Sequence, residues 1–234
     1  MKKIKIIIPA RFKSSRFPGK PIIKILGKEM VIRVSEICSK LFGRKQVIIA
    51  TDDKRIRKVC KDHHFDSIFT PKNCKTGSDR VYFAAKKIKN SDFFVNVQGD
   101  EPLILPKDIK KIIYAKNKFK NHVICGYSLI KYTEEKSNNI PKVVINNSSN
   151  LVYMSRSLVP GVKNKKLEKK NTYLKQVCIY AYNLKELKLF HKLSGKSKNE
   201  NLEDIEILRF LDLGIPVKMI RVSGSSIAVD IKSD

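Results

Sequence analysis

Short apolar runs alternate with amphipathic helical patterns through the first half of this chain, and this alternation constrains the fold more than any other feature. Residues 4–8, 46–51 and 93–97 form mostly apolar runs, which are typical of strands buried on both faces. Helical periodicity separates them, for example over 29–42 and 77–88. Strands that alternate with helices predict an α/β fold built on a mostly parallel, doubly wound sheet.

The pattern continues to the end of the chain without an internal repeat or a linker. The polar stretch 146–150 predicts a turn, and 163–171 predicts a loop. We therefore expect one domain over 1–234, with an antiparallel flap formed by about 125–162. The expected strands cover 4–8, 46–51, 67–70, 93–97, 122–130, 142–145, 151–154, 176–182, 217–222 and 227–229, and the expected helices cover 29–42, 53–62, 77–88, 106–117, 184–193 and 202–213.

The charge balance is strongly basic. Lys and Arg total 49 against 22 Asp and Glu, which gives a formal net charge of +27. Such a charge makes a basic nucleic-acid-binding protein the alternative from another function class. The lysines are scattered, however, and no basic stripe interleaved with aromatic residues accompanies them. We interpret the excess as a Lys-rich composition that also attracts anionic substrates, and we expect no nucleic-acid partner.

Cysteine spacing and hydropathy indicate a cytoplasmic protein. The 5 cysteines are widely spaced and form no CxxC pair, which is typical of reduced thiols. The 4 histidines show no metal-ligand spacing. The apolar run at 4–8 is too short for a signal peptide, and no window approaches a membrane span. We expect a soluble protein without membrane insertion.

A basic loop follows the first predicted strand. Ligands of open α/β sheets bind beyond the carboxyl ends of the strands, so this loop, 9–21, has the position of a binding site. Arg11, Arg16 and Lys20 could surround a polyphosphate together with backbone amides. The loop has neither the GxxxxGK[ST] nor the GxGxxG pattern. A solvated basic loop is the structural alternative, and we favour phosphate binding because of the loop's position.

Two aspartates are candidate Mg²⁺ ligands. Asp100 follows the 93–97 strand, and Asp230 follows a short apolar run near the end of the chain. Mg²⁺ usually takes one or two carboxylates together with phosphate oxygens. A turn without function is the alternative for Asp100, and its place after a buried strand favours the metal site.

Polar residues also open a predicted helix at 75–80. Thr76 or Ser78 could cap this helix, contact a base or ribose, or do both. Arg156 follows a predicted strand and could bind a carboxylate, with a surface salt bridge as the alternative. Acidic residues at the start of the 202–213 helix suit the helix dipole, and we assign no further role to them: Glu203, Asp204 and Glu206.

Taken together, these segments resemble the CMP-Kdo synthetases (3-deoxy-manno-octulosonate cytidylyltransferases). That family belongs to the nucleotidyltransferases with a glycosyltransferase-A-like sheet, the fold of nucleotide-diphospho-sugar transferases. The matching segments follow the family's order across nearly the whole chain. They are IIPARFKSSRFPGKPI (7–22), ATDD (50–53), TGSDR (76–80), NVQGDEPLI (96–104), PKVV (141–144), YMSR (153–156), IYAY (179–182) and VD (229–230).

The resemblance implies a role for each matching residue. Catalysis would fall to Arg11, Arg16, Lys20 and Asp100, and Mg²⁺ would be held by Asp100 and Asp230. CTP would be bound by Ala10, Arg11, Ser15, Arg16, Lys20, Thr76, Gly77, Ser78 and Arg80, and the sugar acid by Gln98, Arg156, Gln176, Tyr180 and Arg209.

The same resemblance implies the reaction. CMP would pass from CTP to a 2-keto-3-deoxy sugar acid, Kdo or a close relative, with release of pyrophosphate, for the synthesis of lipopolysaccharide or capsule. The resemblance also implies a homodimer, with the flap at about 125–162 as the contact.

Three departures from the family pattern leave the sugar open. The family's HxGIYxY segment begins here with Gln176 and has Cys178 at the glycine position. We place the family's EQLR segment at 209–212, which begins with Arg209 and Phe210. The family's Thr-Pro after the second metal aspartate is absent. A cytidylyltransferase for a different ulosonic or nonulosonic acid is therefore the alternative within the same reaction class.

Overall fold

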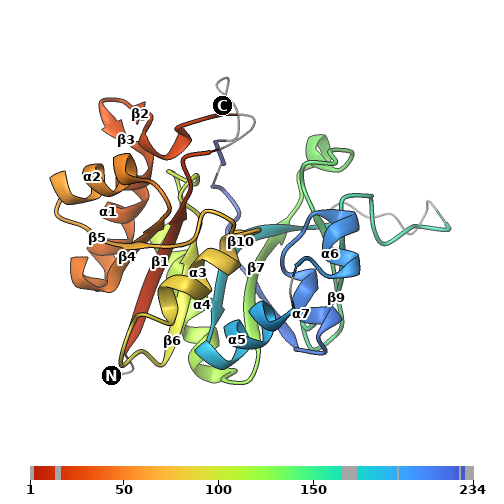
Figure 1. Ribbon diagram of the computed structural model, residues 1–234. Helices are drawn as coiled ribbons and strands as arrows, with labels where there is room; N and C mark the ends of the chain where they lie inside the picture. Colours follow the sequence, from red (N-terminus) through yellow and green to blue (C-terminus); the bar gives the residue numbers. More distant parts are fainter. Residues whose placement is uncertain (1–2, 14–16, 165–172, 194, 227, 230–234) are drawn as a thin grey trace.

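The computed structural model describes residues 3–13, 17–164, 173–193, 195–226 and 228–229. Within these residues, one sheet has the strand order β11-β7-β10-β6-β1-β4-β5, with β8 and β9 attached beside β10 (Figure 1). The strands are β1 (Ile4–Ala10), β2 (Lys24–Ile25), β3 (Lys28–Glu29), β4 (Val47–Thr51), β5 (Asp66–Phe69), β6 (Phe93–Val97), β7 (Val123–Leu129), β8 (Lys142–Ile145), β9 (Leu151–Ser155), β10 (Leu174–Tyr182) and β11 (Val217–Arg221).

Helices cover both faces of the sheet, as the alternating sequence pattern predicts. Neighbouring residues of β1 point to opposite faces, so Ile6 and Ile8 pack in one buried cluster and Ile7 in the other. Three helices contribute to the first cluster: α1 (Met30–Phe42), α2 (Lys54–Asp62) and α4 (Pro106–Lys118). The second cluster contains side chains of α3 (Gly77–Ala85), α5 (Leu184–Lys192) and α7 (Leu208–Asp212), and a short α6 (Lys198–Glu203) precedes α7.

The sheet is mostly parallel. β1 pairs in parallel with both β4 and β6, β4 with β5, and β7 with β11. β10 is antiparallel to β6 and β7, and β8 is antiparallel to β9 and β10. The parallel pairing places the carboxyl ends of β1, β4 and β6 at one edge of the sheet, where the basic loop and Asp100 follow. The fold class expected from the sequence is confirmed.

The helix expected over 202–213 is wrong, because two short helices occupy this region. α6 ends at Glu203, and Asp204 takes the left-handed conformation with φ of 51°. The Glu203 carboxylate accepts hydrogen bonds from the Ser155 hydroxyl and the Arg156 backbone amide, at 2.7 and 2.8 Å. Glu203 therefore ends a helix, where the sequence predicted the beginning of one.

Three further details of the structure bear on the expected elements. Within the expected flap at about 125–162, β7 lies on the main path of the sheet, and β8 and β9 form an antiparallel pair attached beside β10. Ala228 and Val229 lie outside any strand, and Ile227 lies outside the described residues. The hairpin of β2 and β3 was not predicted; its turn is Leu26-Gly27, with φ of 48° and 76°. Positive φ at both turn residues matches the twist of a two-residue hairpin.

No helix in the described part of the chain combines the length and the apolar character that crossing a membrane requires.

Candidate active site

A cavity of about 710 Å³ opens at the carboxyl ends of the parallel strands. It lies where the basic loop after β1, the segment after β6 and the start of α3 meet. Nine of the residues predicted from the sequence line it: Ala10, Arg11, Lys20, Thr76, Gly77, Arg80, Gln98, Asp100 and Arg156. Side chains from four separate stretches of sequence are therefore gathered around one space.

The loop after β1 is closed by a backbone hydrogen bond from the Gly19 amide to the Phe12 carbonyl oxygen, at 2.9 Å. Gly19 has φ of 75°, and a Cβ there would lie 3.2 Å from the Phe12 ring. Glycine is therefore required on both conformational and steric grounds. The closure turns Lys20 toward the cavity, where its Nζ lies 2.7 Å from an Asp100 carboxylate oxygen. Ser15 and Arg16, also predicted here, lie outside the described residues.

Asp100 is the candidate metal ligand that the structure describes. Its side chain is half-buried, and its backbone oxygen accepts a hydrogen bond from the Val229 amide at 2.9 Å. This bond brings the end of the chain to the Asp100 segment, although Asp230 itself lies outside the described residues. Carboxylate oxygens suit Mg²⁺, and two of them with phosphate oxygens form a common site. The described part of the donor set, Asp100, is therefore of a kind that suits the ion.

The start of α3 forms another wall of the cavity. The Thr76 hydroxyl accepts from the Asp79 amide, and the Asp79 carboxylate accepts from the Thr76 amide, both at 3.1 Å. This capping box confirms Thr76 as the N-cap. A Cβ on Gly77 would lie 3.4 Å from the Gln98 amide nitrogen and 3.6 Å from a Glu206 carboxylate oxygen. Gln98 and Glu206 therefore converge on the first turn of α3.

Arg80 is held at the cavity wall rather than free within it. Its guanidinium donates to the Asp52 carboxylate at 2.9 Å and to the Thr70 hydroxyl, and the side chain is almost fully buried. Asp52 follows β4, so this ion pair links the carboxyl end of β4 to the start of α3. The position of Arg80 at the cavity was predicted, and the ion pair that fixes it was not.

Arg156 keeps its positive charge available. Its guanidinium donates to the backbone oxygens of Glu203, Asn138 and Asp204. Carbonyl oxygens orient a guanidinium without neutralising it, and the Asp204 carboxylate lies 4.0 Å away. The pKa of Asp204 is lowered by its hydrogen bond from Lys196 and, less strongly, by the charges of Arg156 and Arg11. The surface salt bridge that was the alternative for Arg156 is therefore a weak, exposed contact.

Three predicted residues lie off the cavity lining. The Ser78 hydroxyl is buried 3.0 Å from the Tyr182 hydroxyl. Tyr180 is 2% exposed, and its hydroxyl accepts from the Gln176 side-chain amide at 3.1 Å. Burial raises the pKa of the Tyr180 phenol well above its usual value, so it stays protonated at neutral pH. Gln176 and Tyr180 therefore form a neutral pair on β10.

Arg209 is also remote from the cavity lining, because it is 1% exposed in the core. Its guanidinium lies 2.6 Å from the Glu200 carboxylate and 3.1 Å from the Asp79 carboxylate. The Arg209 charge that we had treated as a departure on the sugar side is thus neutralised within the fold. Residues 206–209, Glu-Ile-Leu-Arg, themselves fit the family's EQLR pattern at three positions, so the register expected above was three residues late.

Several residues in or next to the cavity lining escaped prediction from the sequence. Glu206 was expected only as a helix-start residue, and burial raises its pKa. Burial also raises the pKa of Glu101, beside Asp100, to about 7. The loop residues Asn138 and Asn139 line the cavity with no sequence signal that indicates it. The EQLR pattern, placed three residues earlier, could have identified Glu206.

Comparison with known proteins was consistent with this geometry. A family model for cytidylyltransferases matches residues 5–218. A 3-deoxy-manno-octulosonate cytidylyltransferase of Zea mays is 36% identical, over 97% of this chain and 77% of that protein. An 8-amino-3,8-dideoxy-manno-octulosonate cytidylyltransferase of Shewanella baltica (strain OS185) is 32% identical, over 99% of this chain and 95% of that protein.

A solved structure agrees with these relatives. It is described as CMP:2-keto-3-deoxy-manno-octonic acid synthetase complexed with CTP, and it superposes with a TM-score of 0.91. The two sequences are 33% identical, over 99% of this chain and 95% of the other. On the sequence matches and the shared fold together, this chain belongs to the cytidylyltransferase family, which includes the 3-deoxy-manno-octulosonate cytidylyltransferases (CMP-Kdo synthetases).

Proposed function

We propose that this enzyme transfers CMP from CTP to a 2-keto-3-deoxy sugar acid and releases pyrophosphate. The observation that carries the proposal is the composition of the cavity. Arg11, Lys20 and Arg156 bring positive charge to it, and Asp100 stands beside Lys20. A space walled by cations at the carboxyl edge of a parallel sheet suits a nucleoside triphosphate and an acidic co-substrate.

The reaction is a single in-line displacement. The hydroxyl oxygen on the anomeric carbon attacks the α-phosphorus of CTP, a new oxygen–phosphorus bond forms, and the bond to the β-phosphate oxygen breaks. The hydroxyl proton passes to solvent, and pyrophosphate leaves with the bonding electrons. Such transfers depend on positioning and on charge neutralisation. Arg11 and Lys20 are placed to bind the phosphate oxygens, with Arg16 of the same loop as their expected partner.

A divalent metal fits the proposal. Asp100 and Asp230 are the residues that would hold Mg²⁺, and the bond between Val229 and Asp100 supports their proximity. When bound, the ion would neutralise negative charge on the phosphate oxygens of CTP. The Lys20 Nζ lies 2.7 Å from an Asp100 carboxylate oxygen, so its ammonium is placed to orient this carboxylate.

Arg156 is the proposed receptor for the sugar carboxylate. Its guanidinium is oriented by carbonyl oxygens and lacks a close carboxylate partner among the described residues, so it can bind an external one. Gln98 lies between Asp100 and the first turn of α3, where it is placed to reach a sugar hydroxyl.

A second sugar remains a specific alternative. Gln176 and Cys178 depart from the family pattern, and one relative, named above, is specified for an 8-amino sugar. Turnover measured across a panel that contains Kdo, its 8-amino analogue and a nonulosonic acid would decide among them.

The compartment in which the reaction takes place is inferred from the family resemblance and from the cysteines. All five cysteines are free thiols, which suits a reducing compartment such as the cytoplasm.

We also infer a homodimer that meets through the flap, where Val152 is 54% exposed and Leu158 is 38% exposed. Light scattering on the purified protein measures its molecular mass in solution, which distinguishes a dimer from a monomer.

Release of pyrophosphate from CTP tests the proposed reaction, with Asp100→Asn as the decisive variant. We expect at least a 100-fold fall in kcat, because the change removes a charge that acts on the phosphates. Asp66→Asn is the matched control, since Asp66 is an exposed carboxylate at the amino end of β5, away from the cavity. Near-normal turnover of Asp100→Asn in the presence of Mg²⁺ would contradict the assignment.

A further inference from the structure

The exposed face of α4 carries lysines at helical spacing. Lys107, Lys110, Lys111 and Lys118 are all exposed, with Tyr114 among them at 73% exposure. Residues 107, 111, 114 and 118 follow one another at intervals of three or four, and 110 comes three residues after 107. The five residues therefore lie on one side of the helix. We call this surface, residues 107, 110, 111, 114 and 118, the α4 basic face.

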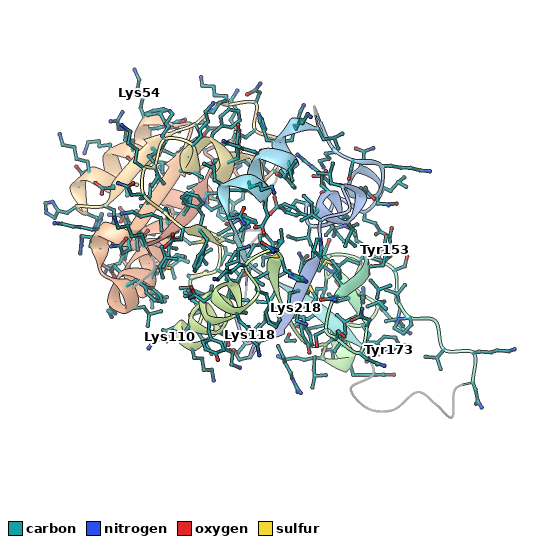
Figure 2. All side chains as sticks on the ribbon, turned by 90° about the horizontal axis from the view of Figure 1, so that it is seen from below. Lys54, Lys110, Lys118, Tyr153, Tyr173 and Lys218 are labelled. Atoms are coloured by element: carbon teal, nitrogen blue, oxygen red, sulfur yellow. The ribbon has the colours of Figure 1, made fainter. Side chains whose placement is uncertain are left out.

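An apolar groove of about 420 Å³ lies beside this face, between α4 and β11. Ala115, Phe119 and Ile220 form its apolar lining, and Lys110, Lys111 and Lys118 border it. Lys218 of β11 extends over the Phe119 ring, with its Nζ 4.6 Å from the ring centroid. Figure 2 shows Lys110, Lys118 and Lys218 in the same region of the molecule, far from Lys54. The groove shares no lining residue with the catalytic cavity.

The positive charge around the groove lacks compensation within the described residues. No carboxylate lines the groove, and no ion pair there involves Lys107, Lys110, Lys111 or Lys118. The acidic residue of α4, Asp108, is buried and accepts a hydrogen bond from the Ser223 amide at 3.0 Å. An external partner with negative charge therefore complements this surface.

α2 provides the contrast within the same molecule. It is equally rich in basic residues, but Arg55 pairs with Asp53 and Lys58 pairs with Asp62, at 2.8 and 2.7 Å. If the lysines of α4 reflected only the lysine-rich composition of the chain, the two helices would have similar surroundings. Lysines that surround an apolar groove, without neighbouring acids, distinguish α4 from α2.

We propose that the α4 basic face and its groove bind the surface of an anionic lipid bilayer. Lysine side chains place ammonium groups at headgroup level, and an exposed tyrosine suits the interface between headgroups and acyl chains. The groove offers apolar surface to the acyl boundary, which a nucleic acid would leave unused. The attachment is peripheral, and it leaves the catalytic cavity on a separate surface.

Sedimentation with lipid vesicles tests this proposal. The full-length protein is mixed with vesicles of phosphatidylcholine alone, or of equal parts phosphatidylcholine and phosphatidylglycerol, at low salt. We expect binding to the anionic vesicles only, and loss of binding as salt screens the charges. The triple variant Lys107→Gln, Lys110→Gln, Lys118→Gln should bind at least about 10-fold more weakly, given the usual contribution of each lysine near an anionic surface.

The matched control removes the same charge from α2, with Lys54→Gln, Lys58→Gln and Lys61→Gln. This variant should bind the anionic vesicles as the unmodified protein does, and both triple variants should retain cytidylyltransferase activity, which shows that they fold. Equal loss of binding in the two variants would overturn the proposal, because attraction would then depend on net charge alone. Absence of binding to anionic vesicles would overturn it as well.

A fluorescence measurement tests the contact itself. The chain has no tryptophan, so Tyr114→Trp introduces a single reporter on the α4 basic face. Its emission should shift to shorter wavelength with anionic vesicles and stay unchanged with neutral ones. If a single-stranded RNA homopolymer shifts the emission and displaces the vesicles at equal phosphate concentration, the surface is a nucleic-acid site and the lipid proposal is wrong.

Discussion

Glu206 is a partly buried carboxyl whose contacts come from a distant part of the chain. Its carboxylate accepts a hydrogen bond from the Ser78 amide at 2.8 Å, at the first turn of α3. Burial is the largest influence on its pKa and raises it above the usual 4.5, while the bond from Ser78 acts in the opposite direction. The folded protein therefore holds the Glu206 proton more strongly than the unfolded chain does.

This shift predicts how Glu206→Gln changes stability with pH. Below pH 4.5 the carboxyl is protonated in both states, so it adds no pH dependence. As pH rises above 4.5, the unfolded chain ionises first, and the wild type loses stability until the folded pKa is passed. The glutamine has no charge to bury, so the Tm of the variant relative to wild type should rise between pH 4 and neutrality.

Differential scanning fluorimetry across this pH range measures the difference. A Tm difference that is independent of pH would contradict the assigned burial of the charge. Activity should fall separately, since Glu206 lies against Gly77, which lines the cavity.

Among individual residues, sequence indicated those whose role is local. Asp53 caps α2, and its carboxylate accepts a hydrogen bond from the Arg55 amide at 2.8 Å. Thr76 or Ser78 was expected to cap α3, and Thr76 does so. Both contacts span two or three residues, so they follow from local sequence. The contact between Glu206 and Ser78 spans 128 residues, which no local pattern encodes.

At the level of elements, Arg209 joins three helices. Its guanidinium binds Glu200 of α6 and Asp79 of α3, while Arg209 itself belongs to α7. Asp79 in turn completes the capping box of α3, so the same carboxylate connects the core to the cavity wall. The three helices are therefore held in register by one buried cation.

Arg209→Met should destabilise the protein by about 3–5 kcal/mol, because it leaves buried carboxylates without their cation. A triple change that adds Asp79→Asn and Glu200→Gln should recover part of this loss, since the buried charges are removed together. Urea unfolding of the single and triple variants measures both effects. A single variant within 1 kcal/mol of wild type would show that the network contributes little.

The elements themselves were predicted with uneven success. The buried strand β6 was predicted with its exact bounds, and α1 and β4 to within one residue, because apolar periodicity reports burial directly. Residues 202–213 were predicted as one helix, although α6 ends at Glu203 and α7 covers only Leu208–Asp212. There the helix ends where Glu203 binds Ser155 and Arg156, two residues that lie 48 and 47 positions away in the sequence.

For the molecule as a whole, charge is the dominant feature. A net charge of +27 repels itself in the folded state, and acids are too few to compensate it. The catalytic cavity uses this charge to attract anions, and the α4 basic face presents it without paired acids.

Salt should therefore stabilise the protein. Raising sodium chloride shortens the Debye length from about 30 Å at 0.01 M to about 10 Å at 0.1 M, which screens the repulsion. We expect a gain on the order of 1 kcal/mol, or about 2–4 °C in Tm for a chain of this size. Thermal unfolding in a chloride series measures it, with sucrose at matched osmolality as the uncharged control. A Tm that falls with salt would indicate that attractive ion pairs dominate.

The sequence by itself determined the layered α/β architecture and the clustering of Arg11, Lys20, Thr76, Gln98 and Asp100, because strand burial and helix caps are local and parallel strands end at a common edge. Tertiary structure alone decided which charges face the cavity. The resemblance assigned both Arg156 and Arg209 to the sugar acid, yet carbonyl oxygens orient Arg156 toward the cavity, whereas Asp79 and Glu200 enclose Arg209 in the core. Burial of a charge depends on partners that folding brings from far along the chain, and a sequence pattern read locally does not contain them.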